Sequence, residues 1–130
     1  MPVFRDADQM HDFYKGLFGV VTAKTNFGKK LDEYGITLKF ILKDPDGVVW
    51  VGPDRVLVGE EASQDADTTM EMTADIAHDV WLKKITVNKA VLTKKIKVKG
   101  SSATIMKLFP HLKSILDEYP EYCQNQGLPL

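Results

Sequence analysis

The sequence predicts an α+β fold, a single, mostly antiparallel sheet of five strands with helices packed on one face. Apolar residues recur at spacings of three and four near both ends of the chain, a pattern typical of amphipathic helices. Between these ends, apolar and polar residues alternate in several short runs, as expected for half-buried strands. A length of 130 residues suits one hydrophobic core, so we expect residues 1–130 to form a single domain.

The first helix is predicted to begin after Asp6 or Asp8, because either carboxylate can cap a helix N-terminus. Residues 22–34 are polar and basic, and their pattern fits either a loop or one more helical turn. The apolar side chains of the first helix form one stripe over three to four turns. They are Met10, Phe13, Tyr14, Leu17, Phe18 and Val21.

Strands are predicted where the apolar period changes to two. Asp44-Pro45-Asp46-Gly47 is a tight turn, since proline presets φ and glycine accepts a positive φ. Because such turns join the first strands, we expect these strands to be antiparallel neighbours. The acidic segment 59–67 lacks large apolar residues and is predicted to be a solvated loop. The five strand runs are 36–43, 48–51, 55–58, 68–73 and 95–99.

Helical spacing returns after the fourth strand. A short helix over residues 74–85, capped by Asp75, would carry one apolar face, and residues 87–92 would form a second short helix. That face consists of Ile76, Ala77, Val80, Trp81 and Ile85.

The last helix is predicted to start at Ser101 or Ser102. Pro110 lies in its middle and is expected to kink or restart it, because proline has no N–H to donate. The tail 117–130 contains two further prolines and is expected to be loosely ordered or docked on the surface.

Residue patterns for bond-breaking chemistry are missing from the sequence. His11, His78 and His111 lie far apart, with no HxxxH, HxH or CxxC spacing, so we expect no metal centre. His78 and Asp75 are expected on the solvated side of their helix. There is no GxSxG, and Cys123 has no neighbouring base, so no covalent catalyst is expected. Neither GxGxxG nor a P-loop occurs, so no cofactor and no enzyme activity are predicted.

The charge distribution argues against a nucleic-acid partner. The formal net charge is −1, which gives no overall basic field. Lys95, Lys97 and Lys99 project from one side of a predicted strand, opposite Ile96 and Val98. These lysines could contact phosphates, but no aromatic residue flanks them to stack on bases. We therefore favour a solvent-facing strand whose lysines deter aggregation.

The cellular location follows only by elimination. A lone cysteine favours a reducing compartment. No signal peptide and no uncharged apolar run of bilayer length are visible, and the C-terminal GLPL is not a peroxisomal address. We expect a cytoplasmic protein.

The late helices carry more large apolar side chains than one small sheet needs. Two interpretations remain open: these side chains are ordinary core, or short and proline-broken helices leave a dry, elongated cavity. Methionines suit an adaptable lining of such a cavity. The candidate ligand-binding residues are Met70, Met72, Val80, Trp81, Ile85, Leu92, Ile105, Met106, Phe109 and Leu112.

The segment 68–112 resembles the sterol carrier protein-2 (SCP2) family. The resemblance rests on KAVLTKKIKVKG followed by MKLFPHL, with Ala90, Ile96, Val98 and Gly100 in the places of the family pattern. Two positions depart from it, since the family usually has glycine at the place of Lys94 and an acidic or amide residue after the last glycine.

The resemblance implies an apolar tunnel between the sheet and its helices. It implies non-covalent binding and transfer of a sterol, a fatty acid or a fatty acyl-CoA. If a ligand is held in this way, we expect its polar end at the mouth, near Lys83, Lys84 or Lys94. Transient membrane contact and either a monomer or a homodimer are compatible with this function. The alternative is a ligand-free protein-interaction or dimerisation module of the same fold, which would pair through an exposed apolar patch.

Overall fold

The structure, a computed structural model, confirms the α+β class and describes residues 3–100 and 102–128. Within the last helix, the side chains of residues 102, 104–106, 108, 109 and 114 are not described. The strands are β1 (Leu38–Lys43), β2 (Gly47–Val51), β3 (Val56–Val58), β4 (Thr68–Thr73) and β5 (Lys97–Gly100). The helices are α1 (Ala7–Lys24), α2 (Phe27–Tyr34), α3 (Ala74–Trp81), α4 (Val87–Leu92) and α5 (Ser102–Asn125), with a 3-10 turn η1 (Gly59–Ala62).

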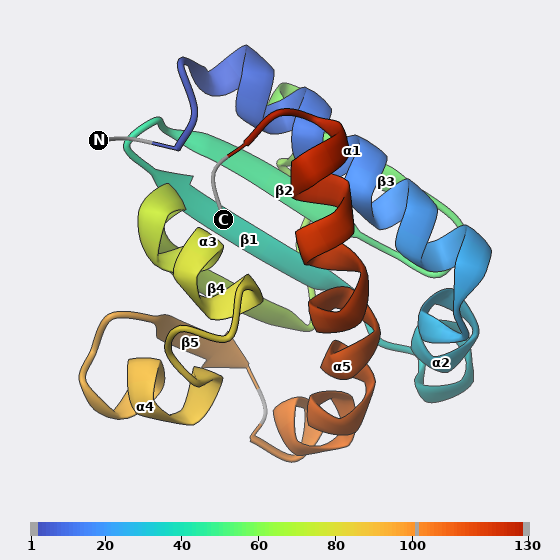
Figure 1. Cartoon of the computed structure of the whole chain (residues 1–130). Helices are drawn as coiled ribbons and strands as arrows, with labels where there is room; N and C mark the ends of the chain where they lie inside the picture. Colours follow the sequence, from blue (N-terminus) through green and yellow to red (C-terminus); the bar gives the residue numbers. More distant parts are fainter. Residues whose placement is uncertain (1–2, 101, 129–130) are drawn as a thin grey trace.

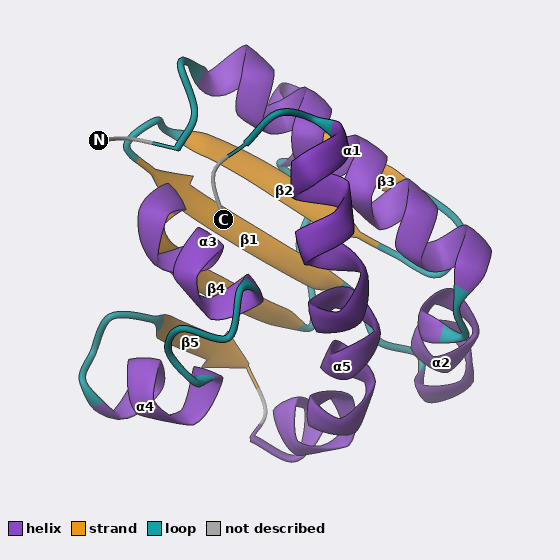
Figure 2. Cartoon of the chain, viewed as in Figure 1, coloured by secondary structure: helices purple, strands orange, loops and turns teal. Residues whose placement is uncertain are grey.

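The five strands form one sheet in the order β3-β2-β1-β4-β5. β1 pairs with β2 and β2 with β3 in antiparallel fashion, which confirms that the first strands are antiparallel neighbours. The chain then crosses back, so β4 lies parallel to β1, and β5 pairs antiparallel with β4. Figure 2 shows the resulting single layer of strands behind the helices.

Helices α1, α3 and α5 cover one face of this sheet (Figure 1). All six residues of the predicted α1 stripe are buried, and α1 runs for 18 residues, longer than the stripe predicted. From the sheet, Leu38, Phe40 and Leu42 of β1 face the helices and are buried, as strand alternation requires. The hydrophobic core therefore lies between the sheet and these three helices.

Two of the connecting segments are more ordered than a solvated loop. Phe27 and Leu31 are buried on α2, so the basic segment 22–34 contains a helix. In the acidic segment 59–67, Ala62 is buried on η1, and the Asp65 carbonyl accepts a hydrogen bond of 3.1 Å from Trp50 Nε1. The prediction of a wholly solvated loop was wrong, because this segment closes over Trp50.

The predicted cap of α3 was also wrong. Thr73, not Asp75, caps the helix, and its hydroxyl accepts a hydrogen bond of 3.1 Å from Ile76 N–H. Asp75 Oδ1 instead accepts a bond of 3.0 Å from Val3 N–H and ties the start of the chain to α3. His78, expected in solvent, is buried.

Helix α5 is one continuous element with Pro110 and Pro120 inside it. The predicted restart at Pro110 was wrong, and so was the prediction of a loosely ordered tail, because the chain is helical as far as Asn125. Tyr119 and Cys123 are fully buried, because they continue a three-to-four-residue spacing from Leu112 and Ile115 that faces the sheet. Packing of this stripe outweighs the backbone hydrogen bonds that the two prolines cannot donate.

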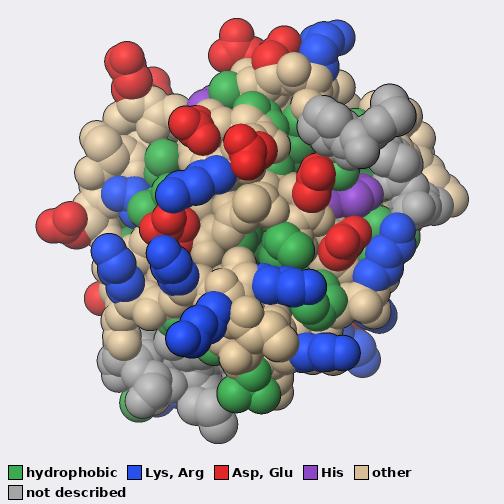
Figure 3. All heavy atoms as spheres, turned by 90° about the vertical axis from the view of Figure 1, so that its left-hand side faces the viewer, with side chains coloured by type: hydrophobic (Ala, Val, Ile, Leu, Met, Phe, Trp, Pro, Cys, Tyr) green, Lys and Arg blue, Asp and Glu red, His purple; other side chains and the backbone are tan. Residues whose placement is uncertain are grey.

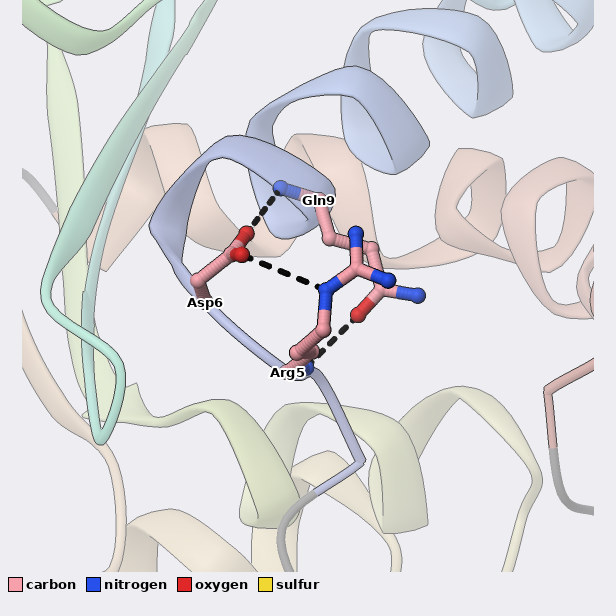
Figure 4. A network of polar contacts seen from close by, with 3 residues as sticks. All are labelled: Arg5, Asp6 and Gln9. Atoms are coloured by element: carbon pink, nitrogen blue, oxygen red, sulfur yellow. Dashed lines mark hydrogen bonds and ion pairs between the residues drawn. The ribbon is translucent and has the colours of Figure 1, made fainter.

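The N-terminus of α1 is fixed by a small polar network (Figure 4). Asp6 Oδ1 accepts a bond of 2.8 Å from Gln9 N–H, and the Gln9 side chain accepts one of 2.6 Å from Arg5 N–H. Arg5 Nε lies 3.3 Å from Asp6 Oδ2. The Gln9 N–H, aided by Arg5, holds the pKa of Asp6 below its usual value of 3.8.

This lowered pKa makes the contribution of Asp6 to stability depend on pH. A carboxylate whose pKa falls on folding stabilises the native state above its unfolded pKa, and that contribution is lost as the pH drops through the folded pKa. We expect Asp6→Ala to lower the thermal midpoint at neutral pH and Asp6→Asn, which keeps a capping oxygen, to lower it less. Melting curves recorded down to strongly acidic pH should show the difference between wild type and Asp6→Ala shrinking. A pH-independent difference would contradict this assignment.

Candidate apolar ligand site

Five of the predicted ligand-binding residues meet in the core between β4, α3 and α5. Their side chains are at most 6% exposed. Ile85, in the turn after α3, is half-buried and packs against the same core. The five buried residues are Met70, Met72, Val80, Trp81 and Leu112.

The remaining four candidates are placed differently. Leu92, on α4, is 82% exposed and lies apart from the buried group. Its helix is held to the core by the buried Ala90, which leaves Leu92 in solvent. Ile105, Met106 and Phe109 lie on the first half of α5, and their side chains are outside the described residues.

A chain of aromatic rings runs through this region. Phe40 on β1 contacts Trp81 on α3 edge to face, with ring centroids 6.0 Å apart. Trp81 lies 6.4 Å from Tyr119 on α5, and Tyr119 meets Phe13 on α1 at 5.7 Å. Each helix of the covering layer therefore contributes a ring, and Tyr119 connects the three helices.

The polar groups in this interior are neutral hydroxyls and one imidazole. Tyr119 Oη lies 2.7 Å from His78 Nδ1. Burial raises the pKa of Tyr119 and of Tyr14 well above their ordinary values, so both stay protonated. Among the described residues, the Tyr14 hydroxyl and Thr68 Oγ1 have no hydrogen-bond partner. The described part of this interior therefore combines apolar side chains with neutral hydroxyls.

Two surface hollows lie outside this interior. One of about 410 Å³ lies between the start of α1 and the end of α5, and its lining includes Asp6, Asp8 and Asp12 beside the buried rings of Phe4 and Phe13. Another of about 440 Å³ lies between α1 and the segment 53–56, and its lining is more apolar. Neither is lined by the predicted residues. Within the described residues, no three His, Cys, Asp or Glu side chains are grouped to hold a metal ion.

Sequence reasoning missed Tyr119, His78 and Phe13 as parts of this region. Phe13 was assigned to the core, but its contact with the C-terminal helix could not be foreseen. The signal for Tyr119 was present, since it follows Ile115 by four residues and precedes Cys123 by four. His78 carried no such signal, because its partner lies 41 residues further along the chain.

The SCP-2 sterol transfer family matches residues 22–113, which is more than half of the chain. The chain belongs to this family. The match covers every strand, α2 to α4 and the first half of α5, so it includes the whole predicted site. Comparison with curated protein sequences gives no match.

Solved SCP2 structures share this fold. The sterol carrier protein domain 2 of Helicoverpa armigera is 19% identical, with a TM-score of 0.66 over 82% of this chain and 87% of that one. The apo sterol carrier protein 2 of Yarrowia lipolytica is 17% identical, with a TM-score of 0.58 over 85% and 89%. The Aedes aegypti SCP-2, solved with palmitate, is 19% identical, with a TM-score of 0.53 over 72% and 92%.

Proposed function

We propose that this SCP2 protein binds an apolar ligand of the lipid class non-covalently and transfers it, with no catalytic step and no cofactor. The candidate ligands are a sterol, a fatty acid and a fatty acyl-CoA. The observation that carries the proposal is the family match over residues 22–113. The palmitate in the related Aedes aegypti structure supports a fatty acid as the first ligand to test.

The proposed binding region lies between β4, α3 and the first half of α5. The burial of Met70, Met72, Val80, Trp81 and Leu112 around one place supports it. Ile85 borders this group, and Ile105, Met106 and Phe109 precede Leu112 on the same helix. Leu92 is proposed to act at the mouth rather than in the interior, because it is exposed.

The driving force would be the transfer of hydrocarbon out of water. Each buried methylene gains about 0.8 kcal/mol, so a long acyl chain gains roughly 10 kcal/mol before ordering costs. Entry requires a helix to move. The second half of α5 is anchored by Tyr119, whereas Pro110 marks a point where the backbone cannot donate a hydrogen bond. We therefore propose that the first half of α5 moves to admit the ligand.

The chain offers a matched pair of fluorescent reporters for this proposal. It contains two tryptophans, and Trp81 lies in the proposed site. Trp50 lies on β2 between the buried Val49 and Val51, so strand alternation points it to the opposite face of the sheet. In Trp50→Phe, Trp81 is the remaining tryptophan. In Trp81→Phe, Trp50 is the remaining one.

We expect palmitate added to the delipidated Trp50→Phe protein to change Trp81 emission saturably. The Trp81→Phe protein should bind palmitate with little change in Trp50 emission. Equal changes in both variants, or an unchanged Trp81 spectrum at saturating palmitate, would contradict the proposed region. A concentration-dependent dimer that binds no lipid would instead support the interaction module. The cytoplasmic location and the choice between monomer and homodimer stay predictions.

A further inference from the structure

A dense group of lysines surrounds α4. Seven lysines and no acidic residue lie between positions 83 and 99. This segment carries a formal charge of +7, so the rest of the chain carries −8, because the whole chain carries −1. All seven side chains are exposed. We call this group the lysine edge, which consists of Lys83, Lys84, Lys89, Lys94, Lys95, Lys97 and Lys99.

The fold gathers these lysines at one margin of the molecule. β5 is the last strand of the sheet, and α4 lies beside it, outside the layer formed by α1, α3 and α5 (Figure 1). Figure 3 views this margin and shows basic side chains gathered over its lower half, with acidic side chains mostly above. Lys97 and Lys99 lie on the edge strand β5, where lysines deter pairing with a strand of another molecule. This role does not explain the lysines that flank α4.

The lysine edge has an apolar centre. Leu92 is 82% exposed and Val91 is 36% exposed, both on α4. Among the large apolar side chains that the structure describes, one more is at least 36% exposed: Tyr34, which lies on α2. Cations around a protruding leucine form the pattern of a surface that inserts into the headgroup region of a bilayer.

The two turns that carry lysines next to α3 and α4 have the same backbone geometry. Lys83 and Lys94 have positive φ angles of 67° and 62°. Lys83 N–H and Lys84 N–H bond back to the carbonyls of Val80 and Asp79. Lys94 N–H and Lys95 N–H repeat this arrangement at the end of α4. This is the Schellman cap, in which glycine is the usual residue. Lysine therefore occupies two positions where backbone energetics alone favour glycine.

We propose that the lysine edge, with Leu92 and Val91 at its centre, docks the protein onto membranes rich in anionic phospholipid. Acidic surfaces attract clustered lysines, and Leu92 adds apolar contact that phosphate binding alone does not use. Among the described residues, Lys83 is the one member of the lysine edge with an ion pair, at 3.7 Å from Asp117. Glu71 faces Lys97 in the register between β4 and β5, but it is paired with Lys43 at 2.9 Å. These acidic groups therefore do not pair with the other six lysines.

A bilayer fits this surface better than a nucleic acid. The segment 83–99 contains no aromatic residue on which bases could stack. The docking extends the proposed function by naming where a lipid ligand would be collected, but it does not depend on ligand binding in the core. The two ideas can therefore fail separately.

The test is flotation of the full chain with phosphatidylcholine vesicles, with and without phosphatidylserine. Each lysine near an acidic surface contributes about five-fold to binding, so the lysine-edge triple Lys89→Gln/Lys95→Gln/Lys97→Gln should weaken vesicle binding by about 100-fold. Leu92→Ser should weaken it by about three- to ten-fold. The matched control, Lys15→Gln/Lys24→Gln/Lys29→Gln, removes the same charge from exposed lysines of α1 and α2. Its vesicle binding should fall far less than that of the lysine-edge triple.

Lys94→Gly separates binding from folding. Glycine suits the positive φ at this position, so the thermal midpoint should not fall, while vesicle binding should drop about five-fold. Palmitate binding, measured without vesicles, should be unchanged in the lysine-edge triple, because none of its three residues belongs to the proposed ligand site. Equal binding to both vesicle types, or equal losses in the lysine-edge and control triples, would overturn the proposal. The proposal would also be overturned if an oligonucleotide bound tightly, competed with the vesicles and bound Leu92→Ser as well as the wild type. The surface would then be a nucleic-acid surface.

Discussion

Tyr119→Ala is expected to lower the free energy of unfolding by about 4 kcal/mol, the typical cost of removing a buried aromatic side chain. Tyr119 is fully buried and contacts rings from α1 and α3. Removing it leaves a cavity where the three covering helices meet. It also removes the hydrogen bond between the tyrosine hydroxyl and His78 Nδ1.

Urea denaturation of the alanine variant and two controls measures this effect. Tyr119→Phe keeps the ring and loses only the hydroxyl, so it should cost about 1–2 kcal/mol. Tyr122→Ala, three residues later on the same helix, removes a half-buried ring and should cost less than Tyr119→Ala. If Tyr119→Ala costs less than about 1 kcal/mol, the C-terminal half of α5 does not pack against the sheet as described.

Gly100→Ala is expected to destabilise the protein by about 3 kcal/mol. Gly100 ends β5 with φ of +126°, in a region that side chains rarely adopt. An added Cβ would collide with the backbone carbonyl of Asp67 and approach Cα of Thr68, neither of which can rotate away. The KIKVKG run thus ends in glycine because the backbone at the start of β4 leaves no room for a Cβ there.

Gly35→Ala provides the matched control for this prediction. Gly35 also has a positive φ, of 65°, but nothing lies within 4 Å of its added Cβ. Gly35→Ala should therefore lower the free energy of unfolding by only about 1 kcal/mol, the cost of placing a side chain at a positive φ. Equal costs for the two substitutions, measured by urea denaturation, would show that the close contact between β5 and β4 is absent.

The spacing of apolar residues predicted which faces of the helices and strands are buried, because that depends only on neighbouring residues in the sequence. The spacing of Met10 to Val21 defined the buried face of α1, since a helix repeats every 3.6 residues whatever it packs against. The alternation in residues 36–43 likewise predicted a half-buried strand, and Leu38, Phe40 and Leu42 are its buried face in β1. The parallel pairing of β1 with β4 had no local signal, because it depends on where the chain returns after β3.

The errors arose where tertiary packing overrides a local rule. Pro110 and Pro120 are helix breakers in isolation, yet α5 continues through both because Tyr119 and Cys123 gain burial. Leu92 was assigned to a lining from its apolar character alone. The structure turns it outward, because α4 is anchored by Ala90, only two residues away. Burial also raises the pKa of the Cys123 thiol, which fits a packing role for this residue.

Native mass spectrometry of the delipidated protein titrated with palmitate tests lipid binding most directly. The proposal predicts one saturable adduct of one palmitate per chain, formed equally by the wild type and by the lysine-edge triple variant. It also predicts that Tyr119→Phe, whose core ring is kept, still forms the adduct. A protein that stays unmodified at every palmitate concentration, while remaining folded, would contradict a lipid carrier.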